Sequence, residues 1–143
     1  MRRFGRPPER QRAYRHRPGA YAILPRDGKI LLTWQEEPHA ELQFPGGGID
    51  AGEQPVAALH REVREETGWR IAAPRRLTTF RRFVWMPDYK AYAEKICHIF
   101  IARPILPLGP PTEEGHIAVW IDTEEALPLL ANEAERAILQ ALR

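Results

Sequence analysis

The sequence contains no serine and only one cysteine, Cys97. The chain therefore has no serine nucleophile, and a lone cysteine completes neither an internal disulfide nor a cysteine zinc cluster. The neighbours Ile96 and Ile99 place Cys97 on a buried strand, so we assign it no chemistry. A chain without disulfides is typical of a reducing compartment, and we expect a cytoplasmic location.

Long apolar runs are also missing. No window approaches the roughly 20 consecutive apolar residues that a membrane-spanning helix needs, so we expect no membrane partner. The 143 residues correspond to one domain rather than two. Hydrophobic residues make up 43% of the chain, which is enough for a core.

The net charge of +2 is unevenly distributed, because seven arginines fall within the first 17 residues. Pro7 and Pro8 break any amphipathic helix there, and no apolar segment follows, which excludes transit and signal peptides. One interpretation is an electrostatic arm for polyphosphate or RNA. The other is a flexible leader that becomes ordered near Tyr14. We predict a basic, flexible leader over residues 1–13 and a single domain over residues 14–143.

Hydrophobic periodicity and turn signals predict an α/β (α+β) domain with mixed strand pairing. The predicted strands are residues 20–25, 29–35, 77–85, 94–102 and 117–121. The predicted helices are residues 55–67, 124–130 and 132–142, with Asn132 as an N-cap. Residues 44–48 are too rich in glycine for regular structure, and the four prolines of residues 104–111 predict a loop. In the first helix, Val56, Leu59 and Val63 form an apolar stripe and Gly68 ends the helix.

That first helix carries three glutamates, Glu62, Glu65 and Glu66, at positions i, i+3 and i+4. These positions share one face, where like charges repel unless a cation lies among them. Mg²⁺ is a natural partner because it prefers oxygen ligands. The alternative is a solvated acidic face that pairs locally with Arg61 and Arg64.

Two features before the helix favour a phosphate site over a solvated face. Gly47 and Gly48 permit a tight loop whose backbone amides can meet phosphate oxygens. Glu53 lies eight residues before Arg61, at a distance that allows an ion pair to fasten the loop to the helix.

The segment from Gly47 to Trp69 resembles the Nudix box, and the resemblance extends over residues 14–142. Every fixed position of the box is filled: Gly47, Glu53, Arg61, Glu62, Val63, Glu65, Glu66 and Gly68. Trp69 occupies the last position, which is usually aliphatic, and it is a minor departure. The resemblance implies the Nudix fold, a mixed β-sheet sandwiched between helices.

The resemblance also implies roles for the residues of the box. Glu62, Glu65 and Glu66 would bind Mg²⁺, for which Mn²⁺ can substitute. The box would be supported by Gly47, Glu53, Arg61 and Gly68. In one family member a further acid lies six residues before a tryptophan. Here Glu114 stands six residues before Trp120, with Glu113 as its competitor, and we predict Glu114. Either Glu65 or Glu114 would be the general base.

The implied reaction is hydrolysis of a pyrophosphate bond in a nucleoside-diphosphate-type substrate. We expect a (d)NTP pyrophosphatase, with dinucleoside polyphosphates, ADP-ribose and RNA 5′ ends as alternatives. A catalytically silent domain that binds nucleotide as a regulator is the non-enzymatic alternative, and the intact box argues against it. Homodimers are common in the family, and the sequence does not decide this point.

The candidates for substrate contacts are less specific than the box. Trp34, beside Gln35, is interpreted either as a base-stacking residue or as a half-buried aromatic of a sheet. Asn132 resembles the purine-contacting asparagine of the family's oxidised-purine nucleotide hydrolase, and it also fits a helix cap. Phe44 and Gly46, just before the box, are the remaining candidates.

Overall fold

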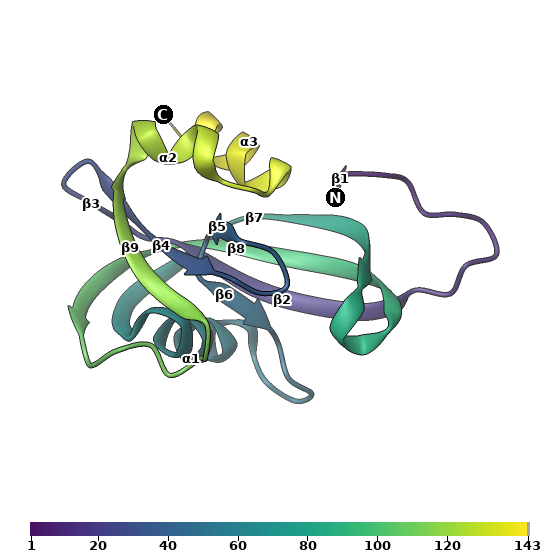
Figure 1. Ribbon diagram of the computed structural model, residues 1–143, viewed down its shortest axis with the longest axis horizontal. Coiled ribbons are helices and arrows are strands. Elements are labelled where there is room, and N and C mark those ends of the chain that lie inside the picture. Colours follow the sequence, from purple (N-terminus) through teal and green to yellow (C-terminus); the bar gives the residue numbers. More distant parts are fainter. Residues whose placement is uncertain (143) are drawn as a thin grey trace.

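Two β-sheets lie between helices in the computed structural model, which describes residues 1–142 (Figure 1). The strands are β1 (Arg2–Phe4), β2 (Arg15–Ile23), β3 (Pro25–Arg26), β4 (Lys29–Gln35), β5 (Glu41–Gln43), β6 (Gly46–Gly48), β7 (Trp69–Met86), β8 (Ala91–Pro107) and β9 (His116–Asp122). The helices are α1 (Pro55–Thr67), α2 (Thr123–Leu129), α3 (Glu133–Ala141) and the short 3-10 helix η1 (Pro87–Tyr89). Helix α1 covers one side of the sheets, and α2 and α3 cover the other (Figure 1). This arrangement confirms the predicted mixed α+β class.

The larger sheet has the strand order β1-β7-β8-β2-β6. Strands β7 and β8 form a long antiparallel hairpin, whereas β2 pairs with β8 in parallel. In the second sheet β4 is central, and both β5 and β9 pair with it antiparallel. The predicted strands are therefore present, but the hairpin is much longer than the apolar runs at 77–85 and 94–102 indicate.

Two cores form on opposite sides of the larger sheet. One packs the sheet against α2 and α3 and includes Phe44, Ile99 and Leu139. The other packs the sheet against α1 and includes Leu59 and Val63. The second core fixes which face of α1 is turned inward, and thereby where the glutamates of this helix lie.

Helix α1 has the predicted bounds, because its two ends are encoded locally. Pro55 opens the helix, where its missing N–H needs no partner. Gly68 ends it in the left-handed conformation, with φ of 78° and its N–H donated to the carbonyl of Arg64. The predicted stripe is wrong at Val56, which is 41% exposed, while Leu59 and Val63 are fully buried.

Residues 46–48 form strand β6 and pair antiparallel with β2, which corrects the expectation of irregular structure. Glycine is required by the close approach of the two strands. A Cβ on Gly46 would overlap the carbonyl of Ala20, and it would lie 2.6 Å from the Cα of Tyr21. Residues that look like a loop in sequence are therefore an edge strand that only glycine can form.

The loop predicted at residues 104–111 begins later than expected, because β8 continues to Pro107. Past Ile101, β8 no longer pairs with β2 and has β7 as its pairing strand. Proline is tolerated on such an edge because the missing N–H faces no partner strand. Pro104 and Pro107 thus extend the hairpin rather than end it.

The first residues also differ from the expected flexible leader. Strand β1 pairs with β7 in parallel, and Phe4 is only 5% exposed. The ring of Phe4 meets Phe80 edge-on, with centroids 5.3 Å apart. Further along, Tyr14 packs against Phe83 on the same hairpin. The start of the chain therefore contributes to the core.

At the other end, the predicted break between two helices is confirmed. The side chain of Asn132 accepts hydrogen bonds from the backbone N–H groups of Ala134 and Glu135, so it caps α3 as predicted. Over residues 1–142, no helix has both the length and the apolar character needed to cross a membrane.

Candidate active site

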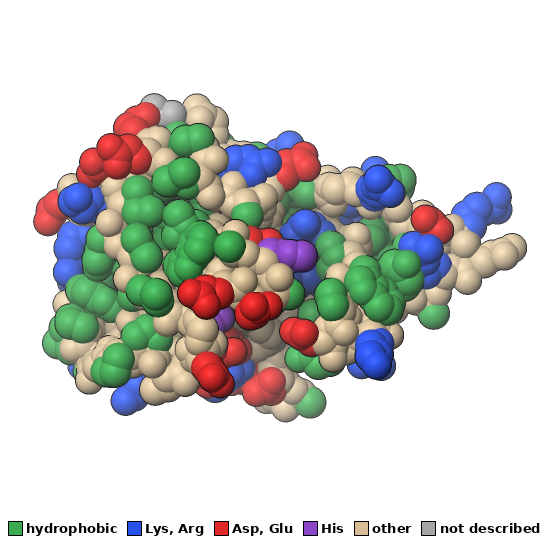
Figure 2. Space-filling model, viewed as in Figure 1, with side chains coloured by type: hydrophobic (Ala, Val, Ile, Leu, Met, Phe, Trp, Pro, Cys, Tyr) green, Lys and Arg blue, Asp and Glu red, His purple; other side chains and the backbone are tan. Residues whose placement is uncertain are grey.

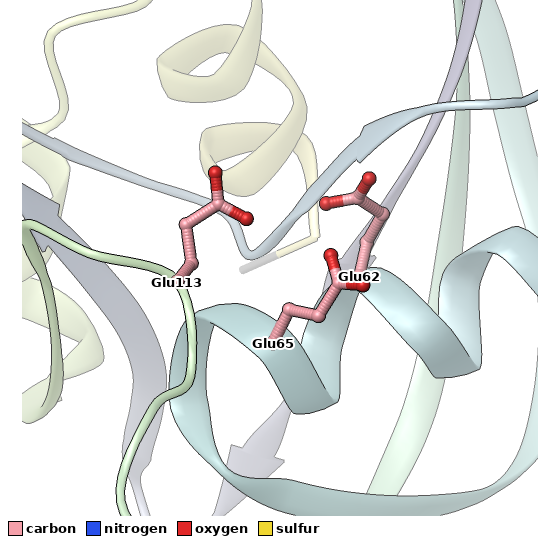
Figure 3. Close-up of side chains that lie close together, drawn as sticks. All are labelled: Glu62, Glu65 and Glu113. Carbon is pink, nitrogen blue, oxygen red and sulfur yellow. The ribbon is translucent and has the colours of Figure 1, made fainter.

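Three carboxylates converge beside helix α1: Glu62, Glu65 and Glu113 (Figure 3). Each offers an oxygen, and these three oxygens lie within 4.8 Å of one another. Glu62 and Glu65 project from the helix, and Glu113 comes from the loop before β9 (Figure 3). Acidic side chains gather near the middle of the face shown in Figure 2. The carboxylates of the predicted site are therefore brought together across elements far apart in sequence.

The loop acid differs from the one that the sequence favours, because the group contains Glu113 in place of Glu114. The backbone N–H groups of Thr112 and Glu113 both donate to the carbonyl of Glu65, at 2.9 and 2.8 Å. These bonds hold the main chain of Glu113 against the last turns of α1. Glu114 is exposed and lies outside the group. A spacing counted back from Trp120 cannot resolve two adjacent acids, whereas this main-chain anchoring does.

Glu66, the third glutamate of the box, is only 7% exposed and does not belong to this group of three. One of its carboxylate oxygens accepts a hydrogen bond from the N–H of Gly46 at 3.0 Å. The other lies 3.8 Å from Nε2 of His116. Burial raises the pKa of Glu66 to about 9, against the opposing effect of the Gly46 hydrogen bond.

His116 lies beside Glu66, and no pattern in the sequence predicts this contact. Its Nδ1 lies 2.9 Å from the hydroxyl of Thr33, and burial lowers the pKa of its ring. The Thr33 hydroxyl also donates to the backbone carbonyl of Glu66 at 3.4 Å. The β4–β9 pair thus holds the buried end of the acidic helix face.

Arg61 connects the loop before α1 to the acidic group, as predicted for this residue and Glu53. Its Nε and Nη2 donate to the two oxygens of Glu53, and Nη2 also donates to the carbonyl of Gly48. Its Nη1 lies 2.9 Å from Glu62 and 3.3 Å from Glu65. Hydrogen bonding to Arg61 lowers the pKa of Glu53 to about 2. Burial raises the pKa of Glu62, although Arg61 opposes this shift.

Gly47 and Gly68, two of the residues predicted to support the box, are required for different steric reasons. A Cβ on Gly47 would lie 2.5 Å from a carboxylate oxygen of Glu62, so a side chain there would displace the acid. A Cβ on Gly68 would overlap the backbone carbonyl of Gly109, in the loop that carries Glu113. Both glycines therefore allow neighbouring segments to approach the acidic group.

A cavity of about 460 Å³ reaches Gly46, the residue that is hydrogen-bonded to Glu66. Gly46 joins the two regions, because it lines the cavity and donates its N–H to Glu66. The walls come from β2, the β4–β5 connection, the β7–β8 hairpin and α3. A concave site of this size beside a charged group fits a small-molecule ligand.

Three of the predicted substrate contacts line this cavity, namely Gln35, Gly46 and Asn132. Asn132 does so while capping α3, so both interpretations of this residue agree with the structure. Trp34 is a half-buried residue of β4 and is not among the lining residues. Phe44 is 1% exposed within the core, and it contributes its N–H, which donates to Glu135 at 3.0 Å.

Comparison with known families shows to which family a chain with this site belongs. The model of the NUDIX domain family matches residues 15–142, nearly the whole chain. The chain belongs to the Nudix family. Nudix hydrolases act on phosphoanhydride bonds, and the expected fold and family are both confirmed.

Individual Nudix relatives are similar at modest identity. The chain is 32% identical over 120 residues to a CMP-5′-(N-acetyl-N-hydroxy-3-aminopropyl)phosphonate hydrolase of Streptomyces rubellomurinus, covering 79% of this chain and 55% of that protein. It is 32% identical over 122 residues to an ADP-ribose pyrophosphatase of Bacillus subtilis, covering 79% and 63%. The chain thus spans less than two thirds of the length of these two relatives.

A further relative is an 8-oxo-dGTP diphosphatase of Haemophilus influenzae, 35% identical over 99 residues, with 66% of this chain and 67% of that protein covered. Among solved structures, a Nudix hydrolase from Nitrosomonas europaea superimposes with a TM-score of 0.72 at 18% identity. That match covers 88% of this chain and 87% of the other, and it shows the fold alone.

The Nudix acids of this chain have the character that a divalent cation requires. Glu62, Glu65 and Glu113 offer oxygen ligands, which are the donors that Mg²⁺ prefers. Among residues 1–142, Arg61 is the cation paired with Glu62 and Glu65, so the group of three acids retains negative charge. We conclude that these residues fit a Mg²⁺ site.

The sequence argument missed the groups deep in the cavity as well as His116. Tyr21, Lys95 and Glu135 all line it, and they come from β2, β8 and α3. The three are spread over the chain, so no local motif marks them. Their side chains meet only because β2 pairs with β8 and α3 packs against the same face of the sheet.

Proposed function

We propose that this protein hydrolyses a pyrophosphate bond in a nucleoside-diphosphate-type substrate with the help of Mg²⁺, and that the substrate is a (d)NTP. The observation that carries the proposal is the junction at Gly46. This residue lines the cavity and also binds Glu66, the neighbour of Glu65 on α1, so a nucleotide in the cavity can direct its phosphates towards the glutamates of α1. Family membership supports the reaction class.

The residues of the acidic group take separate roles in this proposal. Glu62, Glu65, Glu66 and Glu113 would hold Mg²⁺. Bound there, Mg²⁺ supplies neutralisation of phosphate charge and a lowered pKa for water. Glu65 accepts the proton of the attacking water, because it is more exposed than Glu62 and lies farther from Arg61. The products are a nucleoside monophosphate and the remaining phosphorylated group.

The choice of a (d)NTP rests on the size of the cavity and on the relatives. A cavity of about 460 Å³ accommodates one nucleoside, and one relative is named as a nucleoside triphosphate hydrolase. ADP-ribose remains the second candidate because a relative of similar identity is named for it. We further propose a cytoplasmic location, consistent with the single buried cysteine.

The test is release of monophosphate from a panel of (d)NTPs, ADP-ribose, dinucleoside polyphosphates and 5′-triphosphorylated RNA, with Mg²⁺ and with EDTA. We expect Mg²⁺-dependent turnover of the (d)NTPs that is lost in Glu65→Gln. Turnover of another class alone would replace the substrate. Nucleotide binding without turnover of any compound would support the regulatory domain in place of the enzyme.

A further inference from the structure

The deep part of the cavity carries two adjacent cations that the proposed hydrolysis does not use. Lys95 on β8 and Arg82 on β7 are register partners, and both line the cavity. They lie on the face of the sheet that also carries Tyr21 of β2. Phosphate binding belongs to the acidic group on α1, so these cations are available to the other end of a nucleotide.

Hydrogen-bond accounting shows that Lys95 and Arg82 have donors to spare. The ammonium of Lys95 lies 5.9 Å from the ring centroid of Tyr21, and its three N–H donors are more than this one neighbour can accept. Among residues 1–142, the guanidinium of Arg82 has neither a hydrogen bond nor an ion pair, and the buried acid that shares the cavity with it is Glu135. A ligand that reaches Lys95 and Arg82 therefore meets N–H donors that can bind an acceptor on the ligand.

The two α3 residues in the cavity add donors rather than acceptors. The side-chain carbonyl of Asn132 is occupied by the cap of α3, which leaves its amide N–H₂ for a ligand. Burial raises the pKa of Glu135 and favours its neutral form, against the opposing charges of Lys95 and Arg82. One of its oxygens already accepts the N–H of Phe44.

Side-chain acceptors are fewer than donors among the residues that line the cavity. Gln43 donates its amide to Gln35 at 2.7 Å, which leaves the Gln43 carbonyl as an acceptor. The other acids of the lining are Glu41, which is half-buried, and Asp88, which is exposed. The balance of the buried groups is therefore towards donation.

We propose that Lys95 determines base specificity by reading position 6 of a purine or position 4 of a pyrimidine, and that it selects bases with a keto oxygen there (guanine, uracil or thymine) over bases with an amino group there (adenine or cytosine). The proposal rests on the proposed function, since it assigns the cavity to the base. A keto oxygen accepts from the ammonium, whereas an amino group sets donor against donor. A buried polar group left unpaired in this way discriminates strongly between substrates.

The test compares Lys95→Met with wild-type protein and with Lys29→Met, an exposed lysine of β4 paired with Asp122. Calorimetry measures binding of GMP, UMP, AMP and CMP in EDTA, and kinetics measure kcat and KM for the triphosphates with Mg²⁺. We expect wild type and Lys29→Met to prefer the keto nucleotides by about 10- to 100-fold. Lys95→Met should lose this preference through KM, with kcat nearly unchanged, and Lys95→Arg should restore part of it.

Equal binding of all four monophosphates by the wild type would overturn the proposal, as would a preference that survives in Lys95→Met. Lys95→Gln, checked for folding by circular dichroism, replaces the methionine variant if the latter is unfolded. The experiment distinguishes failure of the proposed hydrolysis from failure of the proposed role of Lys95. Base preference without hydrolysis overturns only the proposed function, and hydrolysis without base preference overturns only the role of Lys95.

Discussion

Arg61 and Glu53 meet in a two-pronged ion pair, with Nε to Oε2 at 2.8 Å and Nη2 to Oε1 at 2.9 Å. Such paired hydrogen bonds fix orientation as well as distance, because the guanidinium and the carboxylate are both planar. The remaining nitrogen of Arg61 reaches Glu62. A single side chain therefore sets the loop before α1 and the acids on α1 relative to each other.

Replacement of Glu53 by glutamine should release this orientation without changing the size of the side chain. We expect kcat/KM to fall by about 10- to 100-fold, the usual range when a group that orients metal ligands is removed. Asp50→Asn is the matched control, because Asp50 contacts the same guanidinium at 3.4 Å but is largely exposed. Steady-state kinetics over a Mg²⁺ titration would measure both variants. Equal losses in the two would contradict an orienting role for Glu53.

Mutation of the two adjacent loop acids, Glu113 and Glu114, should have clearly different effects on metal affinity. Glu113→Gln removes a member of the carboxylate group and should weaken metal affinity by at least about tenfold. Glu114→Gln changes an exposed acid outside the group and should leave the affinity within about twofold. Binding of Mn²⁺, followed by electron paramagnetic resonance, measures this directly. A larger loss in Glu114→Gln would restore the assignment that the sequence favoured.

Glu135 should make stability fall as the pH rises. Burial raises its pKa from the ordinary value of 4.5 to about 8 in the folded protein. Between these values the folded state binds more protons than the unfolded state, so the contribution to stability is complete below about pH 4.5 and is lost as the pH rises through 8. Glu135→Gln keeps an acceptor for Phe44 and should gain on the order of a few kcal/mol over wild type at pH 9 relative to pH 5.

Urea unfolding at pH 5, 7 and 9 would measure the effect of Glu135→Gln. Glu133→Gln, at an exposed position of the same helix, serves as the control and should show little dependence on pH. A constant difference between Glu135→Gln and wild type across the three pH values would refute the shift. Glu66 contributes the same trend to all three proteins, so the differences isolate Glu135.

Gly68 and Gly28 offer a matched pair, since both have φ of 78°. Alanine in the left-handed region costs about 1–2 kcal/mol from the backbone alone, and nothing lies within 4 Å of a Cβ at Gly28. At Gly68 the Cβ would also overlap the carbonyl of Gly109, so Gly68→Ala should lose roughly 2 kcal/mol more than Gly28→Ala. Thermal unfolding of the two variants measures the difference, and equal losses would exclude the clash.

Sequence reasoning succeeded where a structural choice is made locally. The bounds of α1 follow from Pro55 and Gly68, and the cap of α3 follows from Asn132, because these signals act within one turn. The acids Glu62 and Glu65 were found for the same reason, since helical spacing alone puts them on one face.

Sequence reasoning failed where contacts between distant segments determine the local structure. Strand β6 depends on how closely β2 approaches Gly46, and the extension of β8 to Pro107 depends on where its pairing with β2 stops. Glu113 is chosen over its neighbour by bonds to the carbonyl of Glu65, and Lys95 faces the cavity because of its strand register. None of these relations has a period or spacing along the chain.

The pairing of β1 with β7 also bears on how the chain matures during its synthesis. Arg2–Phe4 leave the ribosome well before the residues that they pair with, Phe80–Arg82, have been made. In a nascent chain, Phe4 therefore has no packing partner until the β7–β8 hairpin has formed. Contacts between residues so far apart in the sequence form slowly. Strand β1 thus reaches its native place long after its own synthesis, and until then the outer edge of β7 is open to pairing with other chains.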